Sequence, residues 1–336
     1  MQYEWINDVA EMSSDYTIIE FRGIFDEKIE PNTLPENLTT LTFGWNFNQG
    51  IELNTLPENL TTLTFGDFFN QKIEPNTLPE NLTTLIFGKN FNQGIDPNTL
   101  PKNLTTLIFG YEFNQKIEHN FLPKKLTTLI FKGNFDKKIE PNTLPKNLTT
   151  LIFGFEFSQK IELNTLPIKL TTLEFGYRFN HKIEPNTLPE NLTTLTFGNN
   201  FNQKIEPNTL PESLKNIIFN WIYLVKLASI KQYIEMVNNI PNYYHVEIFL
   251  KNDFFGNNGA LLVTTSSRSD LFYCSFATIK YGLKWPYHVF EYKENMWSSD
   301  IYEIQGRYTH PKYGPITVLI NKETYQPYSL AKSALK

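Results

Sequence analysis

The chain has 336 residues, 40% of them hydrophobic, which is enough to bury a sizeable core and excludes a disordered protein. A formal net charge of −5 without any run of Lys or Arg argues against nucleic-acid binding. The single cysteine, Cys274, excludes an internal disulfide, and no apolar run is long enough to cross a membrane.

Residues 1–24 are expected to form an N-terminal cap. Ile19 and Phe21 lie two residues apart, as apolar residues do in the repeat that follows, which predicts a partial repeat here. The amino terminus lacks the basic and then apolar pattern of a secretory signal. We therefore expect a cytoplasmic protein.

Residues 25–220 consist of nine 22-residue repeats. One coil of this size cannot bury its own apolar face, so neighbouring coils must stack and share a continuous core. The period is marked by one phenylalanine in each copy: Phe25, Phe47, Phe69, Phe91, Phe113, Phe135, Phe157, Phe179 and Phe201.

The copy from Phe69 to Asn90 illustrates the unit. Leu85 and Phe87 are spaced two apart on a predicted strand, so both should face the core while Thr84 and Ile86 face outward. The segment between the two extended pieces, with its prolines and asparagines, has the composition of a turn. The pattern predicts a mainly β chain folded as a parallel β-solenoid.

Asparagine recurs at two further positions in the repeat. The column from Asn32 to Asn208 is present in all nine copies, and a looser column begins with Asp26 and Asn48. We interpret both as ladders whose side chains satisfy backbone groups of the turns.

We interpret the Asn-Leu-Thr sequons as by-products of the repeat; they begin at Asn37, Asn59, Asn81, Asn103, Asn147 and Asn191.

A column of carboxylates runs from Glu30 to Glu206, and a lysine stands two residues before most of them. Only Gly50 and Gly94 interrupt the lysine column. This arrangement is typical of a solvated face whose charges compensate one another. A string of calcium sites would need clustered oxygen ligands without adjacent ammonium groups, so no metal site is expected.

The outward face of the predicted sheet is the candidate site for a protein partner. Threonine fills one outward column, from Thr40 to Thr194, and isoleucines occur in succession in the other. The position after the repeat glycine varies and is rich in rings, which suit recognition because they gain contact area at low entropic cost. The alternative is that isoleucine serves β-propensity and the rings only cover the rim. The candidate residues are Ile86, Ile108, Ile130, Ile152, Tyr111, Phe155 and Tyr177.

Threonine columns on a flat solenoid also suggest an ice-binding face. That function requires two threonine files on one face, whereas the second file here is mostly isoleucine.

The period stops after residue 220. Apolar residues at helical spacing predict a helical cap over 221–240, and the short alternating runs beyond it predict a small β-rich, α+β C-terminal domain over 241–336. Cys274 and His288 could serve as nucleophile and base in that domain. Cys274 lies within a predicted strand, however, where a buried structural cysteine is the commoner outcome, so no catalytic residue is assigned.

The unit resembles the FNIP repeat. Phe69, Asn70, Ile73 and Pro75 give the pattern FNxxIxP, followed by LPxxLxxLxFG, which is similar to short leucine-rich repeats. The resemblance implies a curved parallel β-solenoid of leucine-rich-repeat type, without known catalytic residues or cofactors. It also implies an origin in social amoebae or in giant DNA viruses, hence the host cytoplasm if the protein is viral.

One departure from the family pattern affects a turn. Lys132 and Gly133 invert the usual order of glycine and variable residue, at a position where glycine would permit a positive φ.

Together the observations predict a non-catalytic scaffold that binds a protein partner through the solenoid sheet. One alternative is a hydrolase-like C-terminal domain displayed on the repeats. Another is an adaptor that recruits substrates for ubiquitin transfer, as in family members with an F-box, although residues 1–24 are too short for that domain.

Overall fold

The computed structural model describes residues 13–198 continuously. It also describes strand 3–6, residues 200–221 without 202, 204, 207, 208 and 215, and the strands between 245 and 330. In the strands at 3–6 and from residue 216 onward, only the backbone is described. Contacts divide the chain into two units, Met1–Leu192 and Thr193–Lys336.

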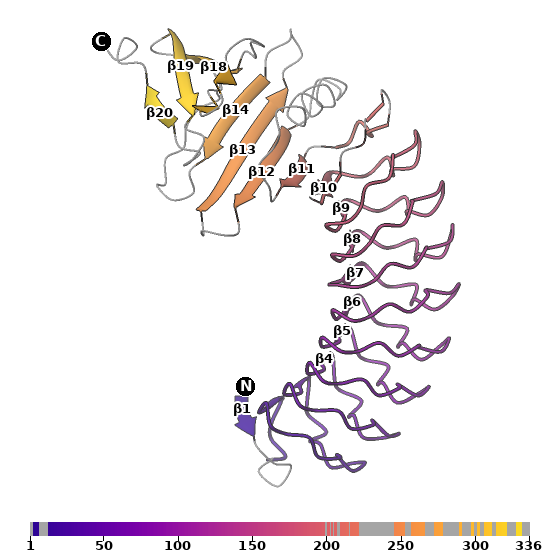
Figure 1. Cartoon of the computed structure of the whole chain (residues 1–336). Coiled ribbons are helices and arrows are strands. Elements are labelled where there is room, and N and C mark those ends of the chain that lie inside the picture. Colours follow the sequence, from indigo (N-terminus) through magenta and orange to yellow (C-terminus); the bar gives the residue numbers. More distant parts are fainter. Residues whose placement is uncertain are drawn as a thin grey trace. The chain divides into compact units, whose positions relative to one another are not determined.

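The first unit is a parallel β-solenoid, as expected from the repeat. Each strand pairs in parallel with the next, and Leu63, Leu85 and Leu107 are in register one coil apart. Within this unit the strands line the inner side of a curved array and the turns spread on the outer side (Figure 1). The strands are β1 (Tyr3–Ile6), β2 (Ile18–Phe21), β3 (Thr40–Thr42), β4 (Thr62–Thr64), β5 (Thr84–Ile86), β6 (Thr106–Phe109), β7 (Thr128–Phe131), β8 (Thr150–Ile152) and β9 (Thr172–Glu174).

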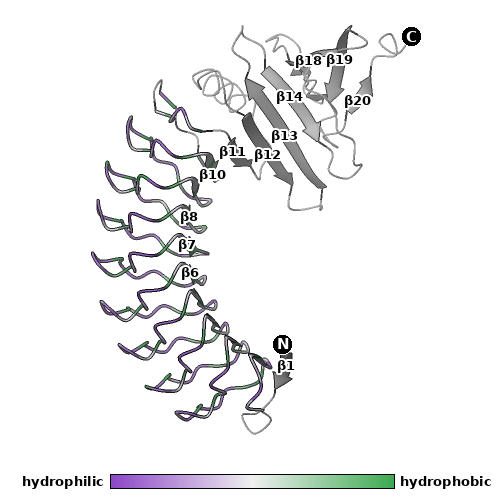
Figure 2. Ribbon diagram, turned by 180° about the vertical axis from the view of Figure 1, so that it is seen from behind, coloured by the Kyte–Doolittle hydropathy of each residue, from purple (hydrophilic) through white to green (hydrophobic). Residues whose placement is uncertain are grey.

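The core runs through the centre of the coils. Leu82, Leu85 and Phe87 are buried, which confirms the period-two prediction for this strand. Figure 2 shows the apolar segments on the inside of the coils and polar segments at the outer turns.

Phenylalanine rings form two stacked columns in this core. Phe87 and Phe91 stack within one coil with ring centroids 3.8 Å apart. Phe87 lies 5.6 Å from Phe109 in the next coil, and Phe91 lies 6.2 Å from Phe113, all with nearly parallel planes. These are offset-stacked distances, so each ring is held by neighbours within its coil and on both sides.

The two asparagine columns have different roles. The column from Asn32 to Asn186 adopts φ angles of 60 to 67°, so its asparagines supply left-handed backbone rather than the ladder that we expected. The second column forms a ladder as predicted. The backbone N–H of Asn70 donates to Asn48 Oδ1 at 2.8 Å, and that of Asn92 donates to Asn70 Oδ1 at 2.9 Å.

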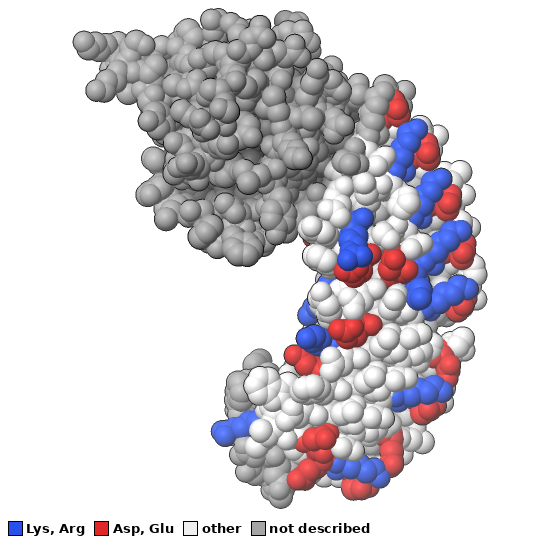
Figure 3. All heavy atoms as spheres, viewed as in Figure 1, with Lys and Arg blue, Asp and Glu red and all other residues white. Residues whose placement is uncertain are grey.

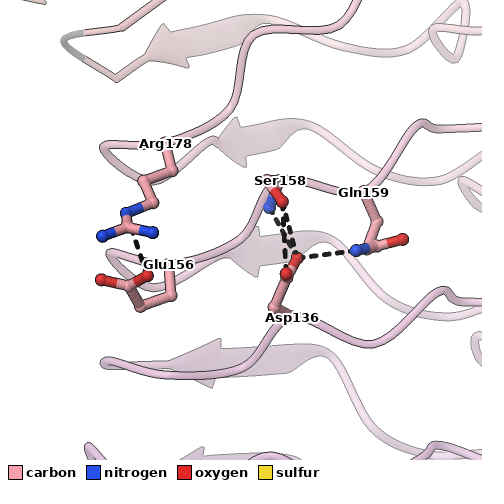
Figure 4. Close-up of polar contacts among 5 residues, drawn as sticks. All are labelled: Asp136, Glu156, Ser158, Gln159 and Arg178. Carbon is pink, nitrogen blue, oxygen red and sulfur yellow. Dashed lines mark hydrogen bonds and ion pairs between the residues drawn. The ribbon is translucent and has the colours of Figure 1, made fainter.

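At Asp136 the ladder keeps the backbone and glutamine donors found at Asn48, and the hydroxyl of Ser158 adds a third. Asp136 Oδ1 accepts from the backbone N–H of Ser158 at 2.8 Å and from Gln159 Nε2 at 2.9 Å, while Ser158 Oγ donates to the same oxygen at 3.1 Å (Figure 4).

The sequon asparagines bridge neighbouring coils. Asn81 Nδ2 donates to the carbonyl oxygen of Glu58 at 2.9 Å, and Asn103 Nδ2 donates to that of Glu80 at 2.8 Å. These amides therefore have a structural role within the repeat.

Glycine holds the position after the strand segment in every coil from β3 to β9 except that of β7, where Lys132 stands. A Cβ on Gly110 would lie 1.7 Å from the carbonyl oxygen of Gly88, and Gly110 has no positive φ. Lys132 has none either. The expectation that glycine supplies a positive φ at this position was wrong; at Gly110 the nearby backbone of the preceding coil, and not φ, favours glycine.

The second unit begins with parallel strands and continues as an antiparallel sheet. Strands β10, β11 and β12 pair in parallel, and β12 to β15 pair antiparallel; β16–β17 and β18–β19–β20 form two further sheets. The strands are β10 (Thr194–Phe197), β11 (Asn216–Trp221), β12 (His245–Asn252), β13 (Asn257–Thr265), β14 (Phe272–Ala277), β15 (Val289–Phe290), β16 (Trp297–Ser298), β17 (Ile301–Tyr302), β18 (Gly306–His310), β19 (Gly314–Ile320) and β20 (Pro327–Leu330).

The helical cap expected over 221–240 lies outside the described residues, apart from Trp221, which belongs to β11. Any helix of the predicted α+β domain also lies outside them. The boundary between the units, after Leu192, falls inside the repeat range 25–220.

Two adjacent phenylalanines provide a matched test of the core. Phe69 is fully buried and Phe68 is 53% exposed. We expect Phe69→Ala to lower the free energy of unfolding by about 3–5 kcal/mol through the cavity it leaves. Phe68→Ala should change it by less than about 0.5 kcal/mol. Urea denaturation of both variants measures the difference, and equal losses would contradict the assigned core.

Two glycines test the close approach of the coils. Gly110→Ala should destabilise the fold by about 1–3 kcal/mol or more, because its Cβ would meet backbone that cannot move aside. Gly94 has nothing within 4 Å of its added Cβ. Gly94→Ala should therefore stabilise by about 0.4–1 kcal/mol by restricting the unfolded chain. Thermal melts of the two variants should move in opposite directions.

Candidate functional site

Four isoleucines form a continuous stripe on the inner face of the sheet. Ile86, Ile108, Ile130 and Ile152 lie on β5 to β8 and pair directly with one another across the strands. Each is partly exposed, while the leucine preceding it is buried. We call these four residues the isoleucine stripe. Strands in a sheet are ~4.8 Å apart, so the side chains form one unbroken apolar surface.

Threonines flank the stripe on the same strands. Thr84 and Thr106 lie two residues before Ile86 and Ile108, face the same side and are partly exposed. The threonine one residue earlier has a different role, because Thr105 Oγ1 donates to the carbonyl oxygen of Thr83 at 3.1 Å. The face therefore combines an apolar column and a column of hydroxyls on strands that side-chain bonds tie together.

The three predicted aromatic residues lie just beyond the strands, and we call them the aromatic rim. Tyr111 and Phe155 are each 41% exposed, and Tyr177 is half-buried. Phe155 stacks on Tyr177 with ring centroids 4.5 Å apart. Tyr111 instead leans over Gly133, where an added Cβ would lie 2.6 Å from Tyr111 Cγ. The structure thus brings two of the three rings together and places the third over glycine.

Polar pairs fix the backbone of the rim. Arg178 Nε lies 3.0 Å from Glu156 Oε2, as Figure 4 shows, and Asn134 Nδ2 donates to Glu112 Oε2 at 2.6 Å. The backbone N–H of Arg178 also donates to the carbonyl oxygen of Phe155 at 3.0 Å. The rings therefore project from loops that are bonded to their neighbours.

The isoleucine stripe ends at a carboxylate. Glu174 pairs with Ile152 in register and occupies the next position of the same column on β9. Burial raises the pKa of the Glu174 carboxyl above its ordinary value of 4.5. Within residues 13–192 no ion pair of this carboxylate is present, so it is an incompletely solvated negative charge at one end of an apolar surface.

Three exposed apolar side chains nearer the amino terminus were left out of the candidate residues. Trp45 is 63% exposed, and Ile24 and Phe68 are also exposed. The backbone N–H of Phe68 donates to the carbonyl oxygen of Trp45 at 2.8 Å, and the indole of Trp45 lies over Gly23. Trp45 occupies the same variable position as the aromatic rim, which was the available signal.

The charged column runs along the outer edge of the array (Figure 3). Lys28 Nζ lies 2.9 Å from a Glu52 oxygen, and Lys72 Nζ lies 2.9 Å from an Asp96 oxygen. The hydrogen bond that Lys28 donates to Glu52 raises the pKa of Lys28, and the one that Lys72 donates to Asp96 raises the pKa of Lys72. The charge-compensated face is confirmed, and because these groups are exposed the pairs contribute little to stability.

The described part of the chain contains no group of three potential metal ligands among His, Cys, Asp and Glu, and no helix long and apolar enough to span a bilayer. Cys274 lies in β14 opposite Val263 of β13. Its side chain and His288, the other member of the hydrolase hypothesis, lie outside the described residues.

Stacked 22-residue coils with one short parallel strand each define a solenoid of the leucine-rich-repeat class. The FNIP repeat model matches residues 25–68, 69–112, 91–134, 135–178 and 179–220, which together exceed half of the chain. The chain belongs to the FNIP-repeat family, as its sequence pattern indicated.

A solved structure shares this fold. The crystal structure of CroV588, a circular leucine-rich-repeat protein from a giant virus, is 46% identical to this chain and superposes with a TM-score of 0.63. The match covers 70% of this chain and 34% of that one, so this chain spans about a third of its relative's length. A comparison with curated proteins found no match.

Glu174→Gln tests the electrostatic description of the stripe. Because the carboxyl pKa is higher in the fold than when unfolded, the charged form costs stability at neutral pH, and the cost disappears below pH 4.5, where both states are protonated. The variant should therefore melt at a higher temperature than wild type at pH 7 and at the same temperature below pH 4.5. A lower melting temperature at pH 7 would contradict the burial of this carboxylate.

Proposed function

We propose that this protein is a non-catalytic scaffold that binds a protein partner through the inner sheet face of its solenoid. The observation that carries the proposal is the isoleucine stripe, an apolar surface four strands wide on an otherwise polar face. Contiguous apolar surface that is open to solvent, here in part, is a feature of interaction sites in soluble proteins.

The architecture of the face supports this proposal. Tandem repeats create extended surfaces rather than enclosed pockets, and repeat solenoids typically use them to bind other proteins. The aromatic rim adds rigid rings beside the stripe, and aromatic residues are enriched among those that dominate binding energy. The proposed setting is the cytoplasm.

A pair of substitutions in the stripe tests this function without disturbing the fold. Thr42 and Thr64 occupy the same column as the isoleucines, so threonine is compatible with this position. We expect the double variant Ile108→Thr, Ile130→Thr to melt at the same temperature as wild type. It should capture much less than wild type of the proteins that wild type binds in host-cell extract. Quantitative mass spectrometry of the captured proteins measures the loss.

Ile168→Asp is the matched control, because Ile168 is 63% exposed and lies in a turn outside the strands. It should capture the same proteins as wild type. Undiminished capture by the folded threonine double variant would reject the stripe as the binding surface.

A further inference from the structure

We propose that the partner element recognised by the isoleucine stripe is an amphipathic α-helix lying along the array axis, with a basic residue at the end that meets Glu174. This inference rests on the proposed function and adds the kind of segment that binds, its direction and its charge.

The spacing of the stripe favours a helix over an extended chain. Its four positions span three strand spacings, roughly 14 Å. Three turns of an α-helix, each presenting one apolar residue, span roughly 16 Å. Three steps of alternate residues along an extended peptide span roughly 20 Å. The helix is therefore roughly 2 Å longer than the stripe, and the extended peptide roughly 6 Å longer. The second difference is larger than the spacing between two coils.

An extended peptide cannot bind here by backbone hydrogen bonds to the sheet. The main-chain groups of β5 to β8 already bond to the neighbouring coils on both sides, so an added strand has no free edge on this face. Recognition here must come from side chains, which is how helices dock on apolar surfaces.

Charge decides which end of the helix lies at Glu174: the end that carries the basic residue. The column of the stripe continues to Glu174 on β9 at one end and to Thr64 on β4 at the other. Glu174 is a partly buried carboxylate without an ion pair in residues 13–192, so a cation from the partner would interact favourably with it. Thr64 is neutral and offers a cation no comparable electrostatic attraction. A lysine or arginine one turn beyond the apolar residues is placed to meet Glu174.

Selection from a library tests this inference. Random 16-residue peptides displayed on phage are selected against the immobilised full chain, and an enriched peptide is then synthesised and titrated by fluorescence anisotropy. We expect enriched peptides to carry apolar residues at spacings of three and four, with Lys or Arg at one end. Enrichment of peptides that alternate with period two, or no enrichment, overturns the inference.

Substitutions then locate the bound peptide. Ile108→Thr with Ile130→Thr should weaken its affinity at least roughly tenfold through lost apolar contact. Glu174→Gln should weaken it roughly three- to tenfold, and a peptide whose basic residue is changed to Gln should show no further loss on that variant. Ile168→Asp should have no effect. Affinity unchanged by the two isoleucine substitutions overturns the inference.

The two proposals fail in different ways. Peptides that require Ile108 and Ile130 but alternate with period two leave the surface in place and remove the helix. Capture of full-length partners that ignores both isoleucine substitutions removes the surface itself.

Discussion

The curvature of the first unit depends on the difference between two spacings, that of successive strands and that of successive phenylalanine rings. On the inner side, backbone hydrogen bonds hold successive strands ~4.8 Å apart. Inside the coils, phenylalanine rings of successive coils lie 5.6 Å apart for Phe87 and Phe109, and 6.2 Å apart for Phe91 and Phe113. Because each coil is thicker at its rings than at its strand, the coils fan outward and the sheet becomes the concave face. The isoleucine stripe lies on that face.

The period of the sequence determines most of this structure, because residues 22 apart must occupy equivalent places. Leu85 and Phe87 were assigned to the core, and Ile86 to the face, from alternation alone, and the burial pattern confirms both. Neither assignment needed information about neighbouring coils beyond their existence.

Conformation and close contact were harder to predict. The Asn32 column was assigned to a ladder because an asparagine can either bond through its amide or adopt a left-handed φ, and composition does not separate the two. A glycine such as Gly110 can be required either by a positive φ or by close packing. Only the distance from its added Cβ to the backbone of Gly88 shows that close packing is the reason here. Trp45 stands at the same variable position as Tyr111 but was left out of the candidate residues, because the sequence does not show which rings at this position are most exposed.

The ion pairs of the outer edge join successive coils in twos at the amino-terminal end of the array. Lys28 serves Glu52 and Lys72 serves Asp96, so each of these lysines covers a carboxylate in the following coil, which has Gly50 or Gly94 in place of its own lysine. At this end the chemical repeat is therefore 44 residues, twice the structural one. Loss of a lysine-bearing coil there would leave the carboxylate of the following coil without its lysine, whereas loss of a glycine-bearing coil would leave Lys28 or Lys72 paired with the carboxylate of its own coil.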